Sequence, residues 1–142
     1  GWPVDVQPTP TGELLIADAT FDRISKVDTS GVLRRVAGWR LFAGDNGPAT
    51  SARLFAPWGI APLADGSFYF TDRDNGRIRK VHADGVILTV AGTGTHGYNG
   101  DGPATTRQHN RARGLALAAN GDLYIADTEN HMIRKLSGGV LS

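Results

Sequence analysis

The stretch DLYIADTENHMIRKL, from Asp122 to Leu136, occurs in three versions along the chain. The other two are LLIADATFDRISKVD, from residue 14, and FYFTDRDNGRIRKVH, from residue 68. Their shared aspartates, Asp18, Asp72 and Asp127, lie 54 and 55 residues apart. Self-similarity at a fixed period near this length indicates an array of equivalent structural units.

The flanking segments follow the same period. PWGIAPLADGS, from Pro57, returns as ARGLALAANGD, from Ala112, and a degenerate version, PVDVQPTPTGE, opens the chain. Two glycine-rich stretches, DNGPAT from Asp45 and NGDGPAT from Asn99, separate the units. We interpret these stretches as connectors, which occur twice because three units need two of them.

Each unit contains four short candidate strands, clearest in the second unit as GIAPL, SFYFT, RIRKV and VILTV (residues 59–63, 67–71, 77–81 and 86–90). Turn signals containing glycine separate them. In RIRKV, Ile78 and Val81 are expected on opposite faces, with Arg79 and Lys80 reaching solvent. A repeated four-stranded antiparallel unit predicts an all-β fold made of β-propeller blades.

The chain length favours one domain over residues 1–142. We place blade 1 at about 1–54, blade 2 at about 55–110 and blade 3 at about 111–142, with its last outer strand incomplete. The chain starts without methionine and contains only Met132. We therefore expect a processed or excised piece of a longer product.

Composition excludes several classes of function. Fifteen basic and 14 acidic residues give a net charge of +1, which favours neither a nucleic acid nor a membrane as partner. The absence of cysteine excludes disulfides, thiolate nucleophiles and sulfur-ligated zinc. No apolar run approaches the roughly 20 residues that cross a bilayer, and GWPVDVQPTPTG lacks the features of a signal peptide, so we expect a soluble chain.

The units resemble NHL repeats. DLYIADTENHMIRKL and AGTGTHGYNGDGPAT (residues 91–105) are similar to the NHL pattern NLYIADT.NHRIRKV followed by AGTGT.G..GDGGPAT, and the likeness covers essentially the whole chain. The first unit departs from it, with Phe21 and Asp22 where the second has Asn75 and Gly76. The resemblance implies a propeller, and the propellers of this family typically have about six blades.

Three blades make an open half-ring with two uncovered apolar faces, more apolar surface than soluble monomers usually expose. Two copies joined head to tail about a two-fold axis would close a ring of six blades, so we expect a homodimer. A fragment of a longer propeller is the alternative.

The recurring aspartates, Asp18, Asp72 and Asp127, are expected to accept backbone N–H groups of hairpin turns. The glycine-rich connectors lack the lysine of a phosphate-binding loop, and the four histidines show no metal-ligand spacing. We therefore expect no catalytic residue, no metal and no cofactor.

Ligand binding is suggested by the positions where innermost strands begin, near the central channel. Trp58 and Arg113 occupy equivalent entrance positions, and an indole beside a guanidinium could hold a planar or anionic ligand. The remaining candidates, from loops expected on the same face, are Trp39, Arg73, His96, Tyr98 and His131. A structural role, with Trp58 in the core and Arg113 covering it, stays open.

We predict a non-catalytic binding scaffold that presents loops around the channel to a protein, peptide or small ligand. The resemblance includes enzymes, so a metal-dependent lyase or hydrolase at the channel mouth is the alternative. Binding of single-stranded RNA, which some NHL propellers perform, is a lesser alternative because acidic residues here accompany the arginines. The residues leave the location unknown, and the resemblance leaves a secreted or periplasmic one open.

Overall fold

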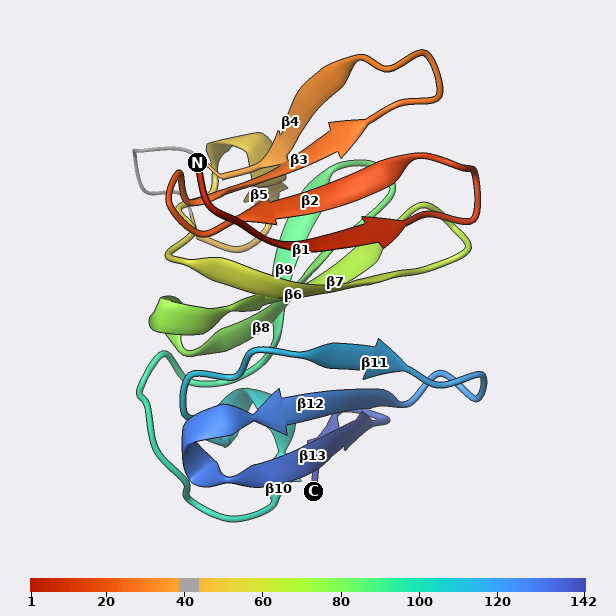
Figure 1. The fold of residues 1–142 in the computed structure, drawn as a ribbon. Coiled ribbons are helices and arrows are strands. Elements are labelled where there is room, and N and C mark those ends of the chain that lie inside the picture. Colours follow the sequence, from red (N-terminus) through yellow and green to blue (C-terminus); the bar gives the residue numbers. More distant parts are fainter. Residues whose placement is uncertain (39–43) are drawn as a thin grey trace.

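Three antiparallel sheets stand side by side in the computed structural model, which describes residues 1–38 and 44–142 (Figure 1). Blade 1 contains β1 (Pro3–Pro8), β2 (Leu14–Asp18), β3 (Arg23–Val27) and β4 (Leu33–Ala37). Blade 2 contains β6 (Pro57–Pro62), β7 (Phe68–Asp72), β8 (Arg77–Val81) and β9 (Val86–Ala91). Blade 3 contains β11 (Leu115–Leu117), β12 (Leu123–Asp127), β13 (Met132–Ser137) and β14 (Val140–Leu141). The predicted all-β fold of four-stranded blades is confirmed.

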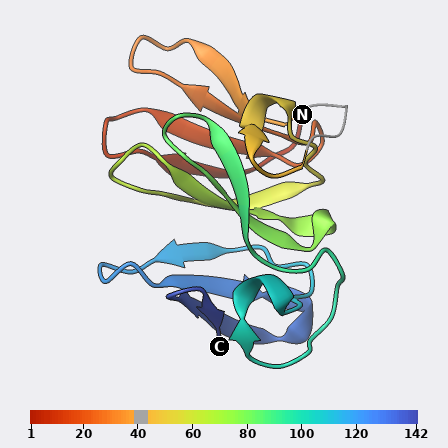
Figure 2. The same cartoon turned by 180° about the vertical axis from the view of Figure 1, so that it is seen from behind.

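Each connector adds a fifth, two-residue strand to the outer edge of the blade that follows it. β5 (Gly47–Pro48) pairs with β9, and β10 (Gly102–Pro103) pairs with β14. A single 3-10 turn follows each of these strands, η1 (Ala49–Ser51) and η3 (Ala104–Thr106), as the rear view in Figure 2 shows. The repeated G-P-A-T stretch is therefore an edge strand and a turn.

The alanine of this stretch joins consecutive blades. The carbonyl of Ala49 accepts the Gly38 N–H at the end of blade 1 (3.0 Å), and the Ala49 N–H donates to the Gly85 carbonyl in blade 2 (2.8 Å). Ala104 makes the same two bonds between blades 2 and 3, with distances of 3.0 and 2.8 Å. The motif occurs twice because it forms the outer joint of both blade pairs.

Helical structure in the described part of the chain is limited to four segments of three residues. Besides η1 and η3, these are η2 (Arg73–Asn75) and η4 (Thr128–Asn130), in the turns between second and third strands. None of the helices in residues 1–38 and 44–142 is long and apolar enough to cross a membrane.

The core consists of apolar layers between blades. We call the side of a blade toward the next blade its forward face and the opposite side its rear face. Forward faces carry Leu15, Ala17 and Ile24 in blade 1 and Tyr69, Thr71 and Ile78 in blade 2. Rear faces carry Phe68, Phe70 and Val81 in blade 2 and Leu123, Ile125 and Leu136 in blade 3. Because the inner faces of both blade pairs are covered, β7 is apolar without alternation.

We call the interface between two neighbouring blades a seam. The two seams are built differently at their inner ends, where the innermost strands meet. Between blades 1 and 2, the Asp5 carboxylate on β1 accepts the Ile60 N–H of β6 (2.8 Å). Between blades 2 and 3, the Gly59 N–H donates directly to the Arg113 carbonyl (2.9 Å). Thr71 also donates its hydroxyl to this carbonyl (3.1 Å), so the backbone of Arg113 is held from two sides.

One histidine in the second seam departs from the repeat. His109 is 1% exposed and stands 55 residues after Leu54, which is buried at the equivalent position. Neither ring nitrogen of His109 has a hydrogen-bond partner within residues 1–38 and 44–142. Burial lowers its pKa to about 4, and the charges of His96, Arg134 and Arg77 act in the same direction.

His109→Leu is expected to stabilise the protein, and more so at acid pH. A folded-state pKa below the unfolded value means that His109 costs stability as the pH falls from about 6.5 to about 4. We expect a gain of about 1 kcal/mol at pH 7.5, where the unpaired nitrogens are removed, and about 2 kcal/mol more at pH 5. Urea unfolding at both pH values measures these gains.

His82→Leu, in a half-buried hairpin turn of blade 2, is the matched control, because it removes a histidine that is not buried between blades. An equal stability change in His109→Leu at both pH values would contradict the prediction.

Candidate functional site

A rim of turns lies at one end of blades 2 and 3. In blade 2, the Asp74 N–H of η2 donates to the Phe55 carbonyl in the connector (3.1 Å). In blade 3, the Glu129 N–H of η4 donates to the Asn110 carbonyl in the same way (3.1 Å). These bonds bring each turn beside the chain that enters the innermost strand.

Three of the predicted ligand-binding residues meet on this rim. Trp58 lies on β6, Arg73 on η2 and Arg113 just before β11. The guanidinium carbons of Arg73 and Arg113 lie 5.5 and 5.1 Å from the centroid of the Trp58 ring, within cation–π range. The half-buried indole thus holds two arginines from neighbouring blades together.

The two arginines differ in how their charge is balanced. Arg73 Nη1 lies 2.8 Å from Asp74 Oδ1, so this cation has an acidic partner. Arg113 is exposed and makes no ion pair with any residue of the described chain. Its backbone is fixed by the seam bonds of Gly59 and Thr71. Arg113 therefore offers an unneutralised guanidinium from a rigid base.

A further arginine of the rim, Arg111, was not predicted from the sequence. Arg111 Nη1 lies 3.2 Å from Glu129 Oε1, and its Nε lies 3.8 Å from Asp74 Oδ1. Arg111 has a φ of 46° and the equivalent Ala56 a φ of 49°, so both connectors turn at this point. The shared turn leaves no signal in the residue types, which are unrelated.

The other predicted ligand-binding residues lie apart from the cluster of Trp58, Arg73 and Arg113, or only at its edge. His96 is exposed, with Nε2 3.3 Å from the Asp74 carbonyl, which brings it to the edge of the rim. Tyr98 lies beside Arg134 instead, with 5.2 Å between the ring centroid and the guanidinium carbon. His131 is an exposed turn residue with a φ of 57° after η4. Trp39 lies outside the described residues.

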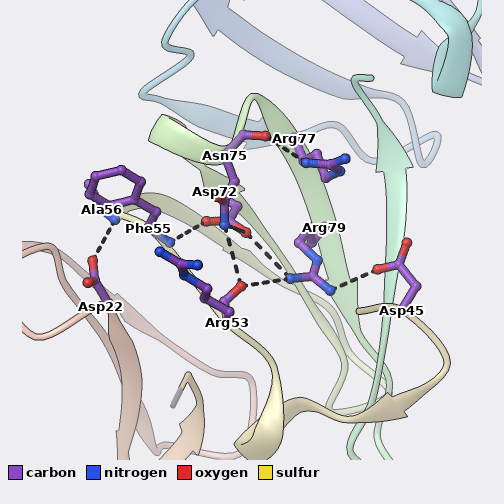
Figure 3. Close-up of polar contacts among 9 residues, drawn as sticks. All are labelled: Asp22, Asp45, Arg53, Phe55, Ala56, Asp72, Asn75, Arg77 and Arg79. Atoms are coloured by element: carbon purple, nitrogen blue, oxygen red, sulfur yellow. Dashed lines mark hydrogen bonds and ion pairs between the residues drawn. The ribbon is translucent and has the colours of Figure 1, made fainter. Parts of the chain in front are cut away.

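A second polar cluster is buried beneath the connector of blade 2 (Figure 3). Asp72, at the end of β7, accepts the Phe55 N–H on Oδ1 (2.8 Å) and the Asn75 side-chain amide on Oδ2 (2.9 Å). Arg79 Nη1 lies 3.4 Å from Asp72 Oδ2, and its Nη2 lies 2.8 Å from Asp45 Oδ1. We call Asp72, Asn75 and Arg79 the connector clamp, because all three hold the preceding connector.

Blade 3 contains the same clamp, formed by Asp127, Asn130 and Arg134. Asp127 Oδ1 accepts the Asn110 N–H (2.6 Å), and Asn130 donates to the Gly97 carbonyl (2.8 Å). Arg134 donates to the carbonyls of Gln108 and Gly100 and to Asp101 at distances of 3.0, 2.8 and 2.8 Å. Asp72 and Asp127 therefore each accept a backbone N–H of the connector. From the turn that follows, they accept the side-chain amide of Asn75 or Asn130 in place of a backbone N–H.

The clamp corrects the expectation that Arg79 reaches solvent. Arg79 is 4% exposed and points into the rear face of blade 2. Burial raises the pKa of the neighbouring Asp72 to about 6, against the opposing effects of Asn75, the Phe55 N–H and Arg79. The repeated arginine is thus a structural ion-pair partner.

Blade 1 lacks this clamp. The equivalents of Asn75 and Arg79 are Phe21 and Ser25, 54 residues earlier. Asp18 remains, and its Oδ1 accepts the N–H groups of Thr20 and Phe21 in its own turn (3.1 and 3.2 Å). The predicted turn-capping role of the aspartate therefore holds in blade 1.

No group of three or more His, Cys, Asp or Glu side chains is placed to hold a metal ion within residues 1–38 and 44–142. The rim itself presents two arginines and an indole. An unpaired guanidinium next to an aromatic ring can bind a carboxylate or a phosphate through paired N–H groups.

Antiparallel sheets of four and five strands, packed side by side, define the protein as part of a β-propeller, and comparisons with known proteins identify its family. The profile of the Teneurin NHL domain matches residues 39–100, and that of the NHL repeat matches residues 110–136. The chain belongs to the NHL-repeat family.

Among similar proteins, SUPPRESSOR OF QUENCHING 1 of Arabidopsis thaliana, a chloroplastic protein, is 37% identical over 134 residues, covering 86% of this chain. An auxiliary nutrient binding protein from Bacteroides thetaiotaomicron is 27% identical, with a TM-score of 0.78 over 93% of this chain. A streptogramin B lyase is 18% identical, with a TM-score of 0.68 over 99% of this chain, and shows the shared fold alone. The chain spans 12%, 36% and 39% of these three proteins, respectively.

Proposed function

We propose that this chain is a non-catalytic interaction module that binds an anionic group of a small molecule, peptide or protein at the rim formed by Trp58, Arg73 and Arg113. The unpaired guanidinium of Arg113 carries the proposal. The seam hydrogen bonds fix the backbone of Arg113, and its guanidinium lies beside the Trp58 ring. Both contacts restrict the side chain before a ligand arrives, which reduces the entropic cost of binding.

The geometry favours an anion over a neutral aromatic ligand. Two guanidinium groups already lie within cation–π distance of the Trp58 ring, so the ring is engaged by cations that can themselves bind an anion. The name of the Bacteroides relative, a nutrient binding protein, supports binding as the function of this kind of propeller. Arg73 would contribute less than Arg113 because Asp74 already neutralises it.

Isothermal titration with benzoate, citrate and inorganic phosphate tests this proposal. We expect at least one of these anions to bind, and Arg113→Gln to weaken its binding about 10- to 100-fold, because charge-assisted hydrogen bonds are lost. Arg34→Gln is the control: Arg34 is 71% exposed and lies 3.9 Å from Asp28, away from the rim.

Two results would count against the proposal. Binding of none of the three anions, or equal binding to the parent and Arg113→Gln, would contradict the anion site. Elemental analysis separates the enzyme alternative: stoichiometric metal, whose removal by chelator lowers thermal stability, would favour the metal-dependent lyase or hydrolase.

We also propose that the site works within a closed ring. Propellers close with roughly four to eight blades, and this chain supplies three sheets. Two copies related by a two-fold axis would complete six blades and place two rims around one channel. The proposed partner is therefore a second copy of the chain.

A further inference from the structure

Equivalent residues of the three blades are buried or exposed according to whether another blade covers them. On the forward face, Ile24 and Ile78 are 0% exposed, whereas the equivalent Ile133 of blade 3 is 68% exposed. On the rear face, Phe68 and Leu123 are 4% and 1% exposed, whereas the equivalent Leu14 of blade 1 is 40% exposed. Both uncovered faces keep the apolar residues of a seam.

The two uncovered faces also match one another. The buried seam between blades 2 and 3 joins Tyr69, Thr71 and Ile78 to Leu123, Ile125 and Leu136. The uncovered faces offer Tyr124, Ala126 and Ile133 on blade 3 and Leu14, Ile16 and Val27 on blade 1. The second pair repeats the composition of the first almost residue for residue. Packing them together would therefore continue an interface that the chain already contains.

Blade 1 differs from the other blades in its relation to a connector: its described sheet has four strands and no connector strand, and Phe21 and Ser25 occupy two of its clamp positions. Arg79 and Arg134 are buried because connector carbonyls and aspartates accept their N–H groups. A buried arginine without those acceptors would be costly. Ser25 avoids that cost, and Phe21 replaces the asparagine that holds the connector in the other blades. The rear face of blade 1 is therefore suited to packing against a blade whose connector blade 1 does not bind.

We propose that blade 3 of a second copy docks on the rear face of blade 1, and that no connector is bound at this contact. The contact occurs twice in the dimer and forms the two new seams of a six-bladed ring. The inference rests on the proposed closure of the ring by two copies. Ile133 of one copy would lie near Ile16 of the other, since their equivalents, Ile78 and Ile125, share one core cluster.

A pair of charged variants tests the seam. Light scattering on a gel-filtration peak should give twice the 15.1 kDa chain mass for the parent protein. Ile133→Lys and Ile16→Glu each place a charge in both seams, so each alone should raise the dimer dissociation constant at least about 100-fold. An equimolar mixture has one parental seam and one Lys–Glu seam, and should restore the dimer to within about 10-fold of the parent.

Val32→Lys, at a 45% exposed turn position outside both faces, is the control and should leave the dimer unchanged. A monomeric parent would overturn both the seam and the ring closure. A dimer that resists both single charges, or a mixture that fails to reassemble, would overturn this seam alone. Anion binding at Arg113 is measured separately, so failure of that site is distinguishable from failure of the seam.

Discussion

Arg79→Met is expected to lower the free energy of unfolding by about 3 kcal/mol at pH 7, because Asp72 loses its cation and has to bind a proton, and the other acceptors of Arg79 lose a buried donor. Asp72 is 0% exposed, and Arg79 is the one cation within ion-pair distance of it among the described residues. The variant also removes the Arg79 hydrogen bond to the Arg53 carbonyl (3.3 Å). These contacts of Arg79, drawn in Figure 3, need N–H donors, which a methionine side chain lacks.

The loss should shrink at acid pH. Burial raises the pKa of Asp72 to about 6, and loss of Arg79 would raise it further. A group whose pKa is raised on folding gives stability that is present below its unfolded pKa and is lost as the pH rises through the folded value. The deficit of Arg79→Met should therefore be smallest near pH 4 and grow through pH 6.

Denaturant unfolding between pH 4 and pH 7 measures this deficit. Arg34→Met is the matched control, because its pair with Asp28 is exposed and its loss should leave the stability almost unchanged. A deficit below about 1 kcal/mol at pH 7, or one that grows on acidification, would show that Arg79 does not neutralise Asp72.

Gly59→Ala is expected to cost about 3 kcal/mol, because an added Cβ would overlap the Arg113 carbonyl oxygen. The innermost strands of blades 2 and 3 meet at this point, and the Gly59 N–H donates to both the Arg113 carbonyl and the Thr71 hydroxyl (2.9 Å each). To remove this overlap, the innermost strands of blades 2 and 3 have to move apart. Arg113 would move with them, so anion binding should weaken together with stability.

Gly47→Ala is the control, since an added Cβ there meets no described atom within 4 Å. Thermal unfolding of the two variants and anion titration of Gly59→Ala make the comparison. A Gly59→Ala variant as stable as Gly47→Ala would show that the seam can open without cost.

The repeat made the blades predictable. Strand position and face follow from alternation and turn residues, which act over a few neighbouring positions. Ile78 and Val81 were placed on opposite faces correctly, and the four strands of the second unit were found within about two residues. The edge strands β5 and β10 were missed because a Gly-Pro pair carries no strand pattern.

The candidate site was predictable only in part. Trp58 and Arg113 could be related because the period places both at the start of an innermost strand. The contact between Trp58 and Arg113 depends on how blades 2 and 3 pack, and the contact of Arg73 with Trp58 depends on the conformation of η2. The repeat period specifies neither of these. Tyr98 and His131 were grouped with them as loop residues, but Tyr98 packs against Arg134 and His131 lies in the turn after η4.

By itself, the sequence determined the repeat unit, its strands and the family, because these depend on residues close together in the chain and on one period. Only the tertiary structure decided that Arg79 turns inward to Asp45, 34 residues away, and that blade 1 has no clamp. The same holds for the unpaired state of Arg113. A charge is buried or left free according to the acceptors that folding brings within about 3 Å of it, and these come from distant segments.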